Sequence, residues 1–324
     1  MDVFTLAFVA AVLTSTAPVL YAALGGALCG RAGVFNIALE GQLLVGAFTA
    51  VAVSWWSGSA WLGVLAAVAA GAVFSLVLAL GAVVWRADAI IVAVGMNLLA
   101  LGGTGFVMRE ALDATGTFAP QGLQGLPDLD ALDGVPVLGA VLGRATVLVP
   151  LAVVLAVVLS LWLSRTSAGL RLRGVGEHPE AATSLGVPVT RYQAVTVLVA
   201  GALCGLGGAQ LSLGTVTAFT ENMTAGRGWV AVAAVMLAVN RPLWVLGACL
   251  LFGAAEAWGF RLQGLGLPQQ LTDAAPYLVT LVVLVLSRVR VRRRLRAADP
   301  LAAESAAHPE ALLSKSAVHR EETR

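Results

Sequence analysis

The chain has 324 residues, of which 59% are hydrophobic and only 12% are charged. Soluble domains carry about 25% charged residues because their surfaces face water, so this composition excludes an ordinary soluble protein. The net charge of +2 gives no indication of a nucleic-acid partner. The three cysteines, Cys29, Cys204 and Cys249, lack the spacing of metal ligands, and we expect small buried thiols.

Five long runs of the chain contain no Asp, Glu, Lys or Arg. A helix needs roughly 20 apolar residues to cross the bilayer core, so each run can hold a crossing. The period-two alternation of outer-membrane strands is absent. We therefore predict an all-α, polytopic transmembrane helical bundle of about nine spans. The expected spans are 4–29, 42–56, 60–84, 89–108, 145–164, 193–213, 228–240, 243–260 and 271–287.

The arginines indicate an orientation, because positively charged loops stay in the cytoplasm. Arg31 follows the first span, so the N-terminus is expected outside and the Arg-rich loop 165–192 inside. Nine crossings also place Arg241 inside. The acidic, Gly- and Pro-rich loop 109–144 is expected outside, and the polar tail 297–324 is expected to be a disordered cytoplasmic segment.

Two polar, glycine-containing stretches, 30–42 and 214–228, do not fit continuous spans. Irregular backbone at membrane depth is tolerated only where protein buries it or water reaches it. Glycine-interrupted segments at matching places in two halves are typical of a translocation site, and the string GALCG occurs at both 26–30 and 201–205. If residues 30–42 or 214–240 re-enter the membrane, the count becomes eight or ten.

The loop between the fifth and sixth spans has the pattern of a short exposed helix. Pro179 suits the first helical position, and Glu180 suits the first turn, where the helix dipole favours an anion. Ala181 and Ala182 favour helix, and Gly186 suits the position just past its end. Such a helix has too little apolar face to be buried in its own chain. It is either a docking element for a partner or a solvated connector.

Four segments in order carry a family resemblance. The loop matches the pattern G-x-x-L-R-A-V-G-E-N-P-x-A-A-x-x-x-G-I except at Gly174 and His178, where Ala and Asn are usual. The other three segments are Arg31–Gly41, Asn97–Ala100 and Gly226–Ala231. Together, from about residue 18 to 287, they resemble ABC-transporter inner-membrane permeases of the branched-chain amino acid and ribose type. The closest resemblance is to the nucleoside and simple-sugar permease subfamily.

The resemblance implies a permease domain over 1–296 in the bacterial cell membrane, with nucleosides as the expected cargo. Its implied partners are two ATP-binding subunits, a second permease subunit and an external binding lipoprotein or periplasmic protein. The contacts with the ATP-binding subunit are expected at Gly176, Glu177, His178, Pro179, Glu180, Ala181, Ala182 and Gly186. The chain has no G-x-x-x-x-G-K-[ST] motif, so ATP is expected on the partner and no cofactor on this chain.

Two alternatives to nucleoside import are retained. One keeps the fold and carries a simple sugar such as ribose. The other is an ion-coupled secondary transporter, which requires a carboxylate relay within the spans, and only Glu40 and Glu256 are candidates. An intramembrane enzyme would need paired ligands or a Ser/His pair at membrane depth. All three histidines lie outside the expected spans, so we expect no enzymatic activity.

Polar side chains inside the membrane are costly and are therefore candidate pathway residues. Asn36 and Glu40 are four residues apart and are expected to share a helix face. Glu40 either lines the pathway or pairs internally and holds a broken helix together. Asn97 bonds either substrate or a neighbouring helix. The last group either surrounds a half-helix N-terminus that offers N–H groups to a ligand or forms a solvated external loop; it comprises Glu221, Asn222 and Arg227.

Overall fold

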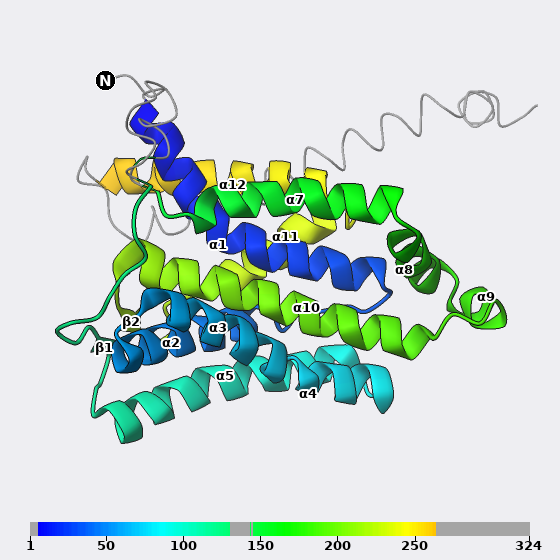
Figure 1. The fold of residues 1–324 in the computed structure, drawn as a ribbon, viewed down its shortest axis with the longest axis horizontal. Helices are drawn as coiled ribbons and strands as arrows, with labels where there is room; N and C mark the ends of the chain where they lie inside the picture. Colours follow the sequence, from blue (N-terminus) through cyan, green and yellow to red (C-terminus); the bar gives the residue numbers. More distant parts are fainter. Residues whose placement is uncertain (1–5, 130–142, 144, 264–324) are drawn as a thin grey trace, which may run out of the picture. The chain divides into compact units, whose positions relative to one another are not determined.

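A computed structural model describes residues 6–129, 143 and 145–263, and this part of the chain is almost entirely helical (Figure 1). The longer helices are α1 (Leu6–Arg31), α2 (Leu39–Ser57), α3 (Ala60–Phe74), α5 (Ala89–Leu112), α7 (Leu148–Arg165), α10 (Val189–Ala209) and α12 (Pro242–Gln263). The shorter ones are α4 (Leu76–Leu78), α8 (Ser167–Glu177), α9 (Pro179–Ser184) and α11 (Arg227–Leu237), with π-helical segments η1 (Ala79–Val84) and η3 (Gln210–Val216). Strands β1 (Thr117–Phe118) and β2 (Phe219–Thr220) form one antiparallel pair.

The predicted all-α membrane bundle is confirmed. Among the described residues, six helices are long and apolar enough to cross a membrane, and α2 lies at another expected span. The predicted span 271–287 and the tail 297–324 lie outside the described residues. Helix α11 has 11 residues, which at 1.5 Å per residue extend roughly 16 Å, about half of the hydrocarbon thickness. It is a half-helix rather than the full crossing expected at 228–240.

The centre of the bundle is closely packed through small residues. Helix α10 lies against α2 and α3, and a Cβ on Gly46 would come within 2.7 Å of the Gly205 Cα. Gly71 and Gly201 leave no room for a side chain at the crossing of α3 and α10. Lipid tails are as apolar as the side chains, so the hydrophobic effect does not drive helices together in a membrane. Helix association depends instead on close van der Waals packing, which small residues allow. The three cysteines are free and buried, as predicted.

The two stretches predicted to be irregular are indeed interrupted. Residues 32–38, called the extended segment below, leave the helical state between α1 and α2: they have turns at 32–33 and at 38 and irregular backbone between them, and their residues alternate between buried and exposed from Ala32 to Asn36. Residues 217–226 contain turns, β2 and four positive-φ positions between η3 and α11. The backbone therefore leaves the helical state at both places, even though the surrounding chain is apolar.

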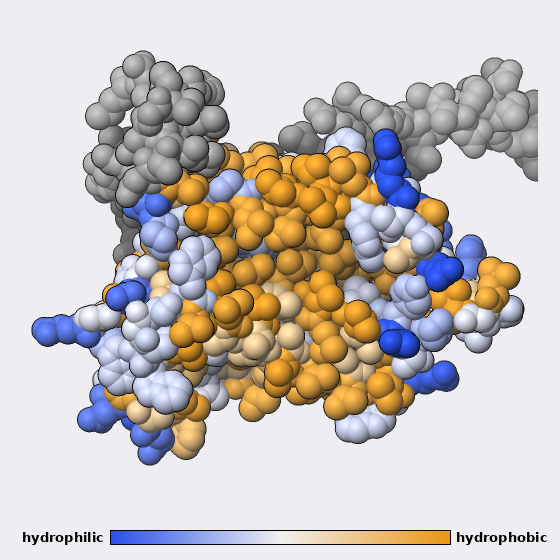
Figure 2. Space-filling view, viewed as in Figure 1, coloured by the Kyte–Doolittle hydropathy of each residue, from blue (hydrophilic) through white to orange (hydrophobic). Residues whose placement is uncertain are grey.

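The two ends of the helical bundle carry different connecting elements. Helices α8 and α9 lie beside the end of α1, whereas β1 and β2 lie at the opposite end (Figure 1). Arg31 at the end of α1 donates a 2.8 Å hydrogen bond to the carbonyl of Asn240, next to Arg241. The loop 165–192 and Arg241 therefore share one end, opposite the described part of loop 109–144, as the predicted orientation requires. Between these ends the visible surface is largely hydrophobic (Figure 2).

Candidate functional site

Glu40 joins the two interrupted stretches. Its Oε1 accepts a 2.8 Å hydrogen bond from the N–H of Gly226, and its Oε2 accepts one of 2.6 Å from the N–H of Gly228. Helix N-termini carry unsatisfied N–H groups and partial positive charge, and the residue that begins α11 has no side-chain cap of its own. The carboxylate of Glu40, from the first turn of α2, supplies that cap. This geometry corresponds to the second role predicted for Glu40, in which it pairs internally and holds a broken helix together.

The cap depends on the small size of its partner. A Cβ at Gly228 would lie 2.7 Å from Oε2 of Glu40 and closer still to the Glu40 backbone. Any side chain at Gly228 would therefore push α11 away from α2. The N-terminus of α11 does not present these two N–H groups to a ligand, because Glu40 already occupies them.

Asn97, in the middle of α5, holds the start of α2 from the other side. Its Oδ1 accepts a 2.8 Å hydrogen bond from the N–H of Gly41, and its Nδ2 donates one of 3.1 Å to the carbonyl of Ile37. Both backbone groups lie at the junction between the extended segment and α2, where regular helix bonding is lost. Two roles were predicted for Asn97, a bond to substrate or a bond to a neighbouring helix. In the structure its side chain bonds to backbone groups at the start of α2.

The expectation that Asn36 and Glu40 share a helix face is wrong. Asn36 lies in the extended segment before α2 and is only 4% exposed. Its Oδ1 accepts a 2.9 Å bond from the N–H of Ala38, and its Nδ2 donates a 3.2 Å bond to Gln42. Gln42 in turn donates to Ser75 at 2.8 Å. Sequence reasoning missed Gln42, although an amide inside the charge-free run 41–85 was a visible indication.

The three polar residues before α11 do not form one cluster. Glu221 lies 3.4 Å from Arg109 of α5, and these two side chains are 38% and 53% exposed. Arg227 instead forms an ion pair with Glu256 of α12, and both side chains are less than one quarter exposed. The Asn222 side chain has no hydrogen-bond partner within the described part of the chain. The predicted group is therefore divided between an exposed pair, a half-buried pair and one free amide.

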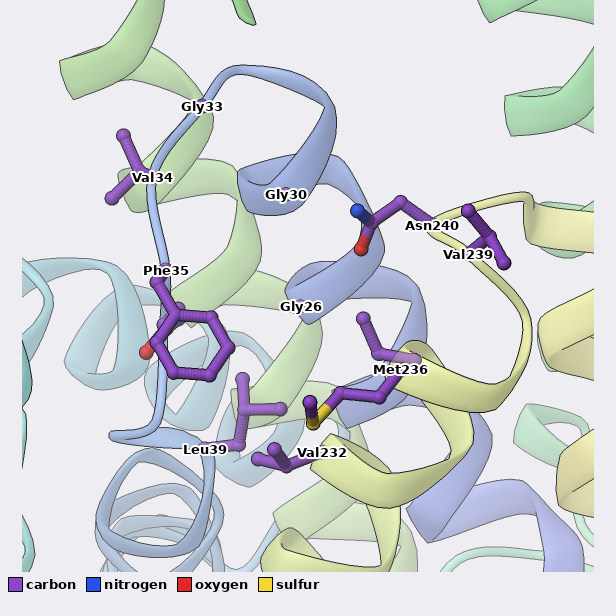
Figure 3. Close-up of a pocket in the computed structure, with 12 residues that line it drawn as sticks. Gly26, Gly30, Gly33, Val34, Phe35, Leu39, Val232, Met236, Val239 and Asn240 are labelled. Carbon is purple, nitrogen blue, oxygen red and sulfur yellow. The ribbon is translucent and has the colours of Figure 1, made fainter. Parts of the chain in front are cut away.

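Two cavities follow the same face of α11. The first, of about 310 Å³, is lined by Glu40, Asn97, Asn222 and Trp229. The second, of about 430 Å³, lies between the extended segment and the later turns of α11 (Figure 3). In Figure 3, Phe35 and Leu39 line one side of this hollow, and Met236 and Asn240 line the other. Because Leu39 borders one cavity and Glu40 the other, the capped junction lies between them.

Two aromatic residues at these cavities were missed in the sequence. Trp229 follows the glycine that is capped by Glu40 and is 46% exposed, and Phe35 in the extended segment is 45% exposed. Each lies inside a segment that carried the family resemblance. An aromatic residue within a polar, glycine-containing interruption was the available indication, and both residues border the cavities.

The short helix predicted at Pro179 is present as α9. His178 precedes it without a side-chain capping bond, and Gly186 follows it with a φ of +77°, as its predicted position requires. Ala182 is the buried residue of this helix, whereas Leu185 just beyond it is 83% exposed. Sequence reasoning missed Leu185, which gives this end of the protein an unpartnered apolar side chain.

The preceding helix α8 links this loop to the extended segment. A Cβ at Gly33 would lie 3.2 Å from the Cα of Gly176, so the two backbones are in close contact. Glu177 lies 3.9 Å from the guanidinium of Arg31. Helix α8 therefore packs against residues 31–33, which are the start of the segment that leads to Glu40.

A helical bundle whose two interrupted segments meet inside the membrane has the architecture of a transport protein. Residues 8–286 match the family described as the permease component of branched-chain amino acid transport systems, and the chain belongs to this family. It is a multi-pass protein of the cell membrane, as predicted, and its family is one of transport components.

Several relatives with named functions match this chain over most of its length. The guanosine ABC transporter permease protein NupQ of Bacillus subtilis is 36% identical, over 85% of this chain and 90% of the relative. The nucleoside ABC transporter permease protein NupC of Lactococcus lactis is 32% identical, over 86% and 91%. The putative glucose ABC transporter permease protein TsgC13 of Haloferax volcanii is also 32% identical, over 88% and 94%. No solved structure matches the chain.

Proposed function

We propose that this chain is a permease subunit of an ATP-driven importer of nucleosides and that the face of α11 forms part of its translocation pathway. The observation that carries this proposal is the junction of the two interrupted segments at Glu40, with a cavity on either side along one half-helix. The names of the similar guanosine and nucleoside permeases support the cargo. A second permease subunit would cover the open side of these cavities.

Within this pathway, we assign different roles to the polar residues. Glu40 and Asn97 are positioning residues, because all of their described hydrogen bonds go to backbone groups at the junction. Trp229 and Asn222 are the residues that face the cargo. An exposed indole offers a stacking surface for a nucleobase, and a free amide can both donate to and accept from its edge.

Coupling to ATP hydrolysis would pass through α9. Its exposed surface and Leu185 suit insertion into a partner, which we take to be the ATP-binding subunit. A displacement of α9 would move α8, which touches residues 31–33 at Gly33 and Arg31. The extended segment would transmit that movement to Glu40 and hence to α11. ATP is used by the partner subunits, and this chain needs no cofactor and no nucleic acid.

Substrate delivery requires a further partner on the opposite face. An external binding lipoprotein or periplasmic protein would deliver nucleoside at the end that carries β1 and β2. The expected outside location of loop 109–144 supports this side. The described part of that loop is fixed to β2 through the pairing of Thr117 with Thr220, so a protein docked there would contact the chain just before α11.

A simple sugar is the second candidate cargo, because a similar protein is named as a putative glucose permease. Ion-coupled transport is less well supported. Its two candidate carboxylates are both engaged, Glu40 by backbone N–H groups and Glu256 by Arg227. A proton or cation relay would have to break one of these contacts in each cycle.

Uptake by the complete transporter in vesicles tests the proposal. With ATP inside the vesicles and the binding protein outside, guanosine should accumulate and glucose should not. Trp229→Ala should raise the KM for guanosine about tenfold because a stacking surface is lost. Trp229→Phe keeps an aromatic ring, so its KM should stay close to that of the wild-type protein. The matched control is Trp61→Ala, since Trp61 is 47% exposed on α3, away from the cavities. Equal effects of Trp229→Ala and Trp61→Ala would contradict a pathway at α11.

A further inference from the structure

A third cavity lies away from α11, beside the short helix α9. This cleft of about 860 Å³ is formed by the end of η1, by α9 and by the first turns of α10. Two arginines line this cleft: Arg86, just after η1, and Arg191, in the first turn of α10. The end of η1 and the beginning of α10 lie at the same end of the bundle as α9 (Figure 1).

The two arginines of this cleft lack a partner among the residues that the structure describes. Within residues 6–129 and 145–263, neither guanidinium forms an ion pair or a hydrogen bond. Glu180 of α9 also lines the cleft but is farther than 4 Å from both of them. The charged lining is therefore two cations and one anion, a surplus of one positive charge. A phosphodiester carries one negative charge and accepts hydrogen bonds from guanidinium groups.

Part of the cleft is lined by aliphatic residues of the apolar spans. Ala82 and Val83 belong to the last turn of an apolar span that ends at Val84, and Ala194 belongs to the span that begins at Val189. Trp85 is 74% exposed directly before Arg86, a position typical of an aromatic anchor at the membrane interface. Charged groups at the headgroup level and aliphatic groups below them match the two parts of a phospholipid.

We propose that this cleft binds an anionic phospholipid, with the headgroup phosphate between Arg86 and Arg191 and an acyl chain against the partly buried Ala82 and Ala194. The bound lipid would also contact α9 through Pro179 and Thr183, which line the cleft. Because Ala182 is the buried residue of α9, that helix has little other support from the chain. Occupancy of the cleft would therefore hold α9 in place.

Native mass spectrometry of the transporter extracted from vesicles tests this site. The vesicles contain phosphatidylcholine mixed with phosphatidylglycerol. The wild-type protein should retain phosphatidylglycerol in preference to phosphatidylcholine. Arg86→Gln and Arg191→Gln should each lower that retention about fivefold, since one basic residue contributes about that factor at an anionic surface. Thermal unfolding of each variant shows whether the fold persists.

The matched control is Arg171→Gln on α8, outside the cleft. Arg171 is exposed and forms no ion pair with any residue in the described ranges. It should leave phosphatidylglycerol retention unchanged. Equal retention in all variants, or equal loss in all three, would overturn the proposal. Displacement of the lipid by inorganic phosphate would assign the cleft to a free anion instead. Loss of the lipid when the ATP-binding subunits assemble would assign it to that partner.

Discussion

The two interrupted segments satisfy their backbone in different ways. In residues 32–38, side chains from other helices bond two of the carbonyls: Asn97 donates to that of Ile37, and Gln193 donates to that of Ala32 at 3.1 Å. In residues 217–226, other backbone groups supply most of the bonds: the N–H of Met223 donates to the carbonyl of Thr220 at 3.0 Å, the N–H of Glu221 donates to that of Gly116 at 2.9 Å, and β2 pairs with β1. Glu40 is the side chain from another segment that completes the second set.

This difference indicates which segment is fixed and which one adapts. A backbone held by amides from α5 and α10 moves only with those helices. The second segment is held by its turns, by the short pairing with β1 and by one carboxylate, so its junction with α11 is released when the Glu40 contact breaks. The segment before α11 also contains Thr217, Asn222 and Ala225 at positive φ, an unfavourable conformation for residues with a Cβ. We infer that the cargo-dependent movement lies at this second segment.

The largest effect is expected at Glu40. Glu40→Gln removes the charge and one of two acceptors, so one N–H of the α11 N-terminus loses its bond. Hydrogen bonds to charged groups contribute about 1.5–3 kcal/mol, and we expect a loss of about 2 kcal/mol in the free energy of unfolding. Denaturant unfolding in detergent measures this loss. The second segment should also become more accessible to proteolysis.

The control for this change is Glu110→Gln near the end of α5. Glu110 is exposed and forms no ion pair with any residue in the described ranges, so its loss should change stability by less than about 0.5 kcal/mol. If both variants lose the same free energy of unfolding, the Glu40 carboxylate does not stabilise the contact between the two segments.

The fold was largely predictable because membrane insertion imposes a strong pattern. Charge-free runs must be helices, since the bilayer offers no other partner for backbone groups. That argument gave the positions of α1, α5, α7 and α10 within a few residues. It could not show that α11 stops halfway, because the length of an apolar run does not reveal where the chain turns back. The interruptions themselves were visible as polar residues and glycines.

An equal or slightly smaller effect is expected at Asn97 of α5, which holds the first segment in place. Asn97→Ala removes two bonds to backbone groups of Ile37 and Gly41, and net contributions of about 1 kcal/mol each predict a loss of about 2 kcal/mol or slightly less. Asn222→Gly removes an amide without any bond and keeps the φ of +58° that glycine accepts. It should leave stability nearly unchanged and raise the KM for guanosine.

Unfolding in detergent and uptake in vesicles, measured on the same preparations, separate these two asparagines. Equal destabilisation by Asn97→Ala and Asn222→Gly would show that the second segment is held as firmly as the first. A KM change confined to Asn97→Ala would place the cargo at α5 rather than at the start of α11.

The candidate residues were visible in the sequence, but their roles were not. Asn36, Glu40 and Asn97 are all polar residues in apolar surroundings, and that property alone fits a ligand site as well as a structural bond. The distinction depends on partners far along the chain, such as Gly226 for Glu40. The same limit applied to Arg227, whose partner Glu256 lies on α12. Trp229 was passed over because aromatic residues near span ends are usually membrane anchors.

The smallest effects are expected at the two ion pairs that flank the second segment. The Arg227–Glu256 pair is 23% and 17% exposed, whereas the Arg109–Glu221 pair is 53% and 38% exposed. Exposed pairs contribute at most about 1 kcal/mol, because water screens the attraction and the side chains lose freedom. Double-mutant cycles with glutamine should give a coupling energy of about 1.5 kcal/mol for the first pair and below about 0.5 kcal/mol for the second. Equal couplings would mean that the segment is anchored at both ends, and the release of α11 would then require more than the loss of the Glu40 contact.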